Sequence, residues 1–120
     1  MNTNEILKTA VKALDSKKAV DIQAVELGDL TILTEYFIIA GGTSSTHVRS
    51  LADEVEYQLS QAGVEPHHIE GKATGWILLD YDTVIIHVFT PDAREFYSLD
   101  KQWQDGKFID ITDYLDKQGD

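Results

Sequence analysis

The chain has no cysteine, no long hydrophobic run and no recognisable leader segment. Without cysteine the protein forms no disulfide, has no thiolate metal site and uses no cysteine nucleophile, which fits a reducing compartment. No apolar run approaches the roughly 20 residues that cross a bilayer. The first residues, Met1–Glu5, lack the basic and apolar segments of a signal peptide. These absences predict a soluble, cytoplasmic protein with no membrane partner.

Basic residues are also few. The sequence has 10 lysines and arginines against 21 aspartates and glutamates, a formal net charge of −11. Such a chain repels bare nucleic acid at long range, so we expect no direct nucleic-acid binding. A basic protein partner would be attracted, although an acidic balance is also ordinary for proteins without one.

Two amphipathic helices are predicted within a single domain that spans residues 1–120. The first covers residues 3–16 and is capped by Thr3 or Asn4, because its apolar residues recur at helical spacing. The second follows the small residues 41–46 and ends at Gly63, a residue type that commonly stops a helix. We expect the apolar stripe of each helix to pack on the core.

Strands are predicted around the second helix. They cover 19–27, Tyr36–Ala40 as a central strand buried on both faces, 65–70, a later hairpin, and Phe108–Ile111 as a last strand or packed tail. The element order is helix, two strands, helix, three strands, helix and tail. It predicts an α+β fold, a single mixed β-sheet with helices mainly on one face.

The stretch from Gly75 to Trp103 contains both tryptophans and predicts the hairpin and the last helix. Two apolar runs, Trp76–Leu79 and Val84–Val88, flank turn-forming residues and are typical of antiparallel strands. Beyond them, Pro91 fits the first turn of a helix and Thr90 fits its cap.

Alternate residues of this hairpin should lie on opposite faces of the sheet if Asp82 and Thr83 form a two-residue loop. One face is almost purely aliphatic and is predicted to be core: Tyr81 pairs with Val84, Leu79 with Ile86 and Ile77 with Val88. The other face mixes aromatic, aliphatic and polar groups, which favours a contact with a partner: Trp76, Leu78, Asp80, Ile85, His87 and Phe89.

An enzymatic alternative uses the Gly41–Gly42 loop. Metal-dependent nucleotidyltransferases combine such a loop, at the start of a helix, with two alternating carboxylates on a following strand. Asp80 and Asp82 have that spacing, and Glu70 lies on the strand directly after the helix. However, aspartate is also favoured in turns, and the loop lacks the lysine of a P-loop. Helix capping and turn geometry are therefore the preferred interpretation.

No metal site or cofactor is expected. His67 and His68 are adjacent, so in a strand they point to opposite faces. His87 lies alone within an apolar run, where a hydrogen bond within the sheet is the simpler role. No serine has a companion base at a recognisable spacing, so nucleophilic hydrolysis has no support.

Several motifs occur in order along the chain: Tyr36–Ala40, Gly42–Ser45, His47–Val48, Asp53–Val55, Glu70–Gly71, Gly75–Tyr81, Val84–Phe89 and Arg94–Asp100 with Trp103. Together they resemble the ribosomal silencing factor family, RsfS, also called Iojap, from the first helix to about residue 110. One departure is Asp82–Thr83, where the family more usually has glycine and aspartate, so no role is carried over to the turn tip.

The resemblance implies a nucleotidyltransferase-like fold without established transferase activity, so we expect no enzymatic activity. It also implies a translational repressor that binds the large ribosomal subunit through large-subunit ribosomal protein fourteen and sterically blocks association with the small subunit. The free protein would be a homodimer, and the tail from about residue 108 is variable in the family.

The predicted partner-binding residues are Trp76, Asp80, Tyr81, His87, Arg94, Tyr97 and Trp103. Arginine, tyrosine and tryptophan are enriched at interface hot spots, and Trp76 is the expected main contact. Acidic groups would steer the protein to a basic ribosomal surface. The alternatives are the metal-dependent nucleotidyltransferase and a dimeric adaptor with no ribosomal role.

Overall fold

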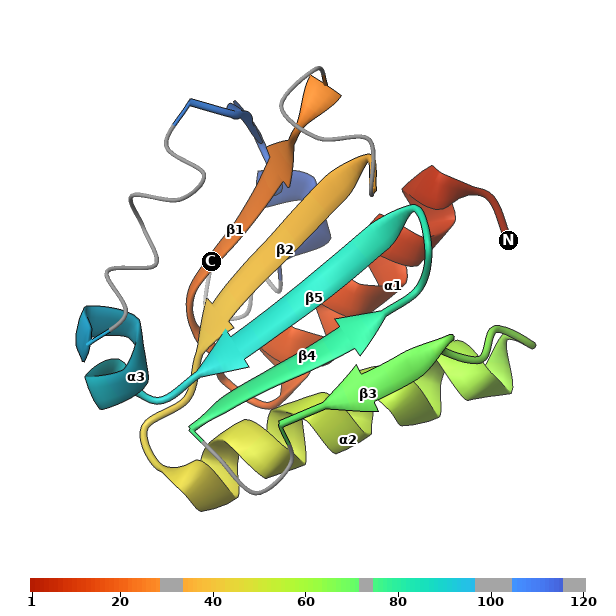
Figure 1. The fold of residues 1–120 in the computed structure, drawn as a ribbon. Coiled ribbons are helices and arrows are strands. Elements are labelled where there is room, and N and C mark those ends of the chain that lie inside the picture. The colour runs from red at the N-terminus through yellow and green to blue at the C-terminus, as the bar shows by residue number, and fades with distance from the viewer. Residues whose placement is uncertain (29–33, 72–74, 97–104, 116–120) are drawn as a thin grey trace.

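The computed structural model describes residues 1–28, 34–71, 75–96 and 105–115 (Figure 1). Its helices are α1 (Thr3–Ser16), α2 (Ser45–Gln61) and α3 (Pro91–Phe96), with a 3-10 turn, η3 (Thr112–Tyr114). Its strands are β1 (Val20–Glu26), β2 (Tyr36–Gly41), β3 (His68–Glu70), β4 (Trp76–Asp80), β5 (Val84–Phe89) and β6 (Lys107–Ile109). The predicted order of elements is confirmed.

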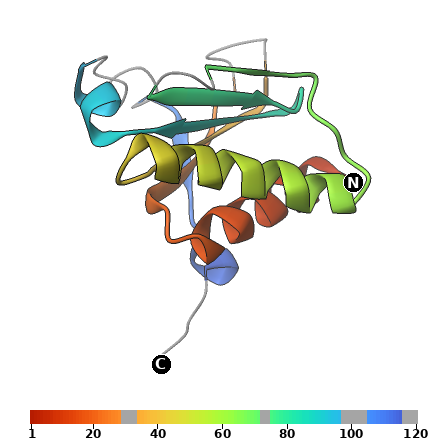
Figure 2. The ribbon, with the colours of Figure 1, turned by 90° about the horizontal axis from the view of Figure 1, so that it is seen from below.

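The strands form one sheet in the order β3-β4-β5-β2-β1-β6. The central pair β2 and β5 is parallel, and the other neighbouring strands are antiparallel. The predicted α+β class with a single mixed sheet is therefore confirmed. Figure 2 shows that α1 and α2 cover the same face of this sheet, whereas α3 follows the end of β5 outside this helix layer.

Side-chain caps begin the two long helices. Asn2 caps α1, because its side-chain oxygen accepts a hydrogen bond from the backbone N–H of Glu5 at 2.8 Å. The predicted caps at Thr3 or Asn4 were therefore wrong by one or two residues. In α2 the cap is Ser44, whose hydroxyl accepts from the N–H of His47 at 3.1 Å.

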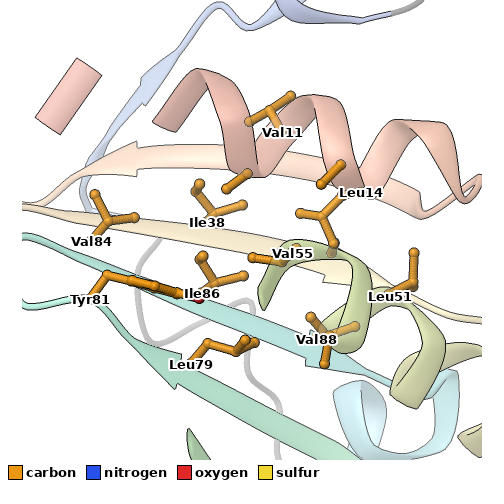
Figure 3. Close-up of a cluster of buried hydrophobic side chains, with 14 of the residues drawn as sticks. Val11, Leu14, Ile38, Leu51, Val55, Leu79, Tyr81, Val84, Ile86 and Val88 are labelled. Atoms are coloured by element: carbon orange, nitrogen blue, oxygen red, sulfur yellow. The ribbon is translucent and has the colours of Figure 1, made fainter. Parts of the chain in front are cut away.

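The main core lies between the sheet and these two helices (Figure 3). The aliphatic face of the hairpin belongs to it as predicted, with Leu79 opposite Ile86 and Ile77 opposite Val88. All four side chains are at most 1% exposed. The two-residue loop is confirmed as well, because the Tyr81 N–H donates to the carbonyl of Val84 at 2.9 Å.

The start of β1 departs from the predicted alternation. Asp21 has a φ of 49°, and the register with β2 shifts between Val20 and Gln23. This β-bulge leaves Val20 45% exposed, so Val20 does not share the buried side of Ala24.

Candidate partner-binding face

The sheet face opposite α1 and α2 carries the mixed side chains of the hairpin. Trp76 of β4 lies opposite Phe89 of β5, Leu78 opposite His87, and Asp80 opposite Ile85. The parallel pairing of β2 with β5 adds Phe37 beside Ile85 and Ile39 beside His87. We call this surface the aromatic face, defined by Phe37, Ile39, Trp76, Leu78, Asp80, Ile85, His87 and Phe89.

Part of the aromatic face is a second, smaller hydrophobic cluster. Its fully covered members include Ile39 and Phe89, and Trp76, Phe37 and Ala93 of α3 pack against them. Leu78 and Ile85 are also only half-buried. The face is therefore neither a solvated surface nor a closed core, which agrees with the mixed composition that the sequence indicated.

A hydrogen bond joins Trp76 to His87 on this face. The indole N–H of Trp76 donates to Nδ1 of His87 at 3.2 Å, and the ring centroids are 6.0 Å apart. Phe37 meets the imidazole edge to face at 4.6 Å, and Phe89 stacks on it at 6.2 Å. Three aromatic rings therefore surround the imidazole.

Burial keeps His87 neutral. Its side chain is 5% exposed, and loss of hydration lowers its pKa from 6.5 to about 4. Because Nδ1 accepts the hydrogen of Trp76, the single ring proton of neutral His87 resides on Nε2. The structure thus places this predicted contact residue beneath Trp76 rather than on the accessible surface.

Helix α3 brings Arg94 to the same cluster. The hydroxyl of Thr90 accepts from the N–H of Ala93 at 3.3 Å, and the Thr90 N–H donates to the carbonyl of Gly75 at 2.8 Å. This confirms the predicted cap and attaches α3 to the start of β4. The guanidinium of Arg94 then lies 6.0 Å from the ring centroid of Phe89, within cation–π range.

Asp80 lies at the far end of β4, four residues and roughly 13 Å from Trp76. Its Oδ1 accepts the N–H of Asp82 at 2.8 Å, and its Oδ2 is 3.6 Å from Nδ1 of His68. Asp82 has a φ of 73°, so it forms the turn. The preferred interpretation of this carboxylate pair as strand end and turn is confirmed.

Tyr81 belongs to the main core and not to the aromatic face (Figure 3). It is 4% exposed, as its pairing with Val84 on the aliphatic face predicted. Burial, together with the carboxylates of Glu56 and Glu65, raises the pKa of its hydroxyl. The other two predicted contact residues, Tyr97 and Trp103, lie outside the described residues.

The loop of the enzymatic alternative serves helix α2. A Cβ on Gly42 would lie 2.8 Å from Cγ2 and 2.9 Å from the backbone nitrogen of Val48, so glycine permits the close approach. The Thr43 N–H donates to Nδ1 of His47 at 2.9 Å, and Nε2 of His47 lies 2.8 Å from the carbonyl oxygen of Lys17. His47 therefore connects the loop to Lys17, the residue that ends α1.

Asp80 is not brought to that loop. Gly41 pairs with Phe89, whereas Asp80 pairs with Ile85, so the two sites are separated by four residues of β5, roughly 13 Å. Within the described ranges no group of three or more histidine, aspartate and glutamate side chains is placed to hold a metal ion. The geometry gives the nucleotidyltransferase alternative no support.

Sequence reasoning missed that His87 is the acceptor for Trp76. The signal was available in the hairpin register, because residues two positions apart on one face of paired strands are diagonal neighbours. Trp76 opposite Phe89 makes His87 such a neighbour. The depth of His87 could not be inferred in the same way, because it depends on the distant strand β2.

Fold and face together define a small α+β domain with an aromatic cluster on the sheet face that α1 and α2 leave uncovered. None of the described helices is long and apolar enough to cross a membrane. The sequence model of the family described as "Ribosomal silencing factor during starvation", RsfS, matches residues 1–120. The chain belongs to this family, and the resemblance seen in its motifs is confirmed.

Individual relatives and a solved structure are similar to this chain over most of its length. The ribosomal silencing factor RsfS of Bacillus subtilis is 36% identical over 112 residues, covering 92% of this chain and 95% of that protein. A crystal structure of a protein from Chromobacterium violaceum has a TM-score of 0.83 at 35% identity, covering 87% of this chain and 88% of that one. The mouse protein named "Mitochondrial assembly of ribosomal large subunit protein 1" is 32% identical over 104 residues, 83% of this chain and 46% of that protein.

Proposed function

We propose that this protein represses translation by binding the large ribosomal subunit through its aromatic face and sterically blocking association with the small subunit. Family membership supports a silencing role, and the name of the mouse relative refers to the large subunit. The observation that carries the choice of surface is Trp76, a half-buried tryptophan whose indole is hydrogen-bonded in place.

The aromatic face has the composition of a protein interface. Trp76, Leu78 and Ile85 are apolar and half-buried, and tryptophan is the residue type most enriched at hot spots. Arg94 and Asp80 lie toward opposite ends of β4 and supply charged groups for the rim. Such a face repeats the usual arrangement of an apolar centre and a polar border.

The net charge of the protein favours one class of partner. At a net charge of −11 the protein is repelled by exposed RNA and attracted by a basic protein surface. Large-subunit ribosomal protein fourteen is the proposed contact. The repression requires no chemical step and no cofactor, because occupying the surface that the small subunit needs is sufficient.

The free protein is proposed to be a homodimer. If its two copies pair through the aromatic face, dimerisation and ribosome binding exclude each other. Apparent affinity for large subunits then falls as protein concentration rises, and analytical ultracentrifugation over a concentration series measures the dimer. A protein that stays monomeric throughout would remove the homodimer from the proposal.

Cosedimentation with purified large subunits tests the surface. Trp76→Ala should weaken binding by about 30-fold, the effect of losing roughly 2 kcal/mol at a hot spot. Tyr57→Ala is the matched control, because Tyr57 is an aromatic residue of α2 that is 57% exposed and lies outside the aromatic face. A folded Trp76→Ala protein that cosediments like the wild type would remove Trp76 from the contact.

Calorimetry discriminates the enzymatic alternative. The proposal predicts no saturable heat when nucleotide and Mg²⁺ are titrated into the protein. Saturable binding that disappears in Asp80→Ala would instead favour the nucleotidyltransferase.

A further inference from the structure

We infer that His87 is a positioning residue for Trp76: its ring accepts the indole hydrogen and holds the indole in the orientation that the aromatic face presents. The consequence for ribosome binding rests on the proposed function. The positioning itself depends only on the geometry of the hairpin.

The position of His87 makes it suited to this role. It occupies β5, which lies between β4 and β2, so the backbone that carries the imidazole is held on both sides. Edge contact with Phe37 and stacking with Phe89 restrict the ring itself. A side chain that is only 5% exposed has almost no surface to offer a partner, so it acts on the accessible face through Trp76.

A polar acceptor at this depth has a specific physical purpose. An aliphatic residue would fill the space among the three rings equally well, but it would leave the half-buried indole N–H of Trp76 without this acceptor. Without that hydrogen bond the indole would no longer be held in the orientation that the aromatic face presents. The hydrogen bond requires the tautomer with its proton on Nε2, since a proton on Nδ1 would point at the indole hydrogen.

The tautomer can be measured on the unaltered protein. In a long-range ¹⁵N–¹H spectrum of the histidine rings near neutral pH, His87 should be neutral, with unprotonated Nδ1 and protonated Nε2. The opposite tautomer, or a charged ring, would overturn the inference without any variant having to fold.

Substitutions test the consequence. His87→Leu removes the acceptor while keeping an apolar side chain of similar size, and His87→Asn returns an acceptor oxygen close to the position of Nδ1. The readout is the indole N–H resonance of Trp76, which is assigned by its absence from the spectrum of Trp76→Phe. His87→Leu should shift this resonance and speed its exchange with solvent, and His87→Asn should return both toward the wild type.

Affinity for large subunits should change in the same variants that shift the indole resonance of Trp76. We expect a loss of about tenfold in His87→Leu, smaller than the loss on removing the indole itself, with partial recovery in His87→Asn. An unchanged indole resonance in folded His87→Leu overturns the positioning role. A shifted resonance with unchanged affinity overturns its importance for binding. If the wild-type protein fails to bind large subunits, the proposed function fails while the spectroscopic result stands.

Discussion

Trp76 and His87 form a diagonal hydrogen bond across the β4–β5 hairpin, with the indole nitrogen 3.2 Å from Nδ1. The residues directly opposite them are Phe89 and Leu78, respectively, so the bond connects neighbouring cross-strand pairs. It links the accessible edge of the aromatic face to a buried ionisable group. Properties of the buried group, including its protonation, therefore bear on the surface proposed to meet the ribosome.

The first prediction concerns acid stability. The pKa of His87 is about 4 in the folded protein and 6.5 when it is exposed, so between these values the unfolded chain binds more protons. The contribution of His87 is fully present above about pH 6.5 and is lost as the pH falls toward 4. Between pH 7 and pH 4.5 this loss should be about 2 kcal/mol.

Urea denaturation of the wild type and His87→Leu at both pH values isolates this effect, because the carboxylates titrate in both proteins. The wild type should lose about 2 kcal/mol more than the variant on acidification. Equal losses in the two proteins would show that His87 does not titrate as its burial indicates.

The second prediction concerns the hydroxyl of Tyr81. It is buried in the main core, and within the described part of the chain it has no hydrogen-bond partner. Tyr81→Phe should therefore leave the free energy of unfolding unchanged or raise it by up to about 1 kcal/mol. The melting temperature should be unchanged or higher. Tyr81→Ala, which removes the ring as well, should cost about 3–5 kcal/mol. A clear loss of stability in Tyr81→Phe would reveal a partner for the hydroxyl.

The third prediction compares two adjacent glycines. A methyl group at Gly42 would meet the backbone nitrogen of Val48 at 2.9 Å, so Gly42→Ala must displace the start of α2 and should cost about 1–3 kcal/mol. At Gly41 the nearest atom, the carbonyl oxygen of Val20, would be 3.4 Å away, and Gly41→Ala should cost less. Denaturant unfolding ranks the two variants, and equal effects would contradict the packing argument.

Much of the fold follows from local patterns in the sequence. Hairpin parity placed Leu79 and Ile86 in the core correctly, because side chains of a strand alternate and the two-residue turn sets the register. Helical periodicity predicts α1 and α2 correctly, because apolar residues that recur at helical spacing lie on one side of a helix. Pro91 and Thr90 marked the start of α3 by their chemistry alone.

The remainder depends on contacts between distant segments. His87 is deeply buried because β5 pairs in parallel with β2, and no local pattern reports that pairing. The bulge at Asp21 relies on a positive φ in a residue other than glycine, which composition does not signal. The contact role predicted for Tyr81 rests on its residue type, whereas its parity in the hairpin already predicts a core position.

Subunit association is the measurement closest to the central claim. Large subunits are mixed with the protein, small subunits are then added, and formation of whole ribosomes is followed by light scattering. The wild-type protein should prevent association in a concentration-dependent manner, and folded Trp76→Ala should not, at the same concentrations. Unimpaired association at saturating wild-type protein, or equal inhibition by Trp76→Ala, would contradict steric silencing through the aromatic face.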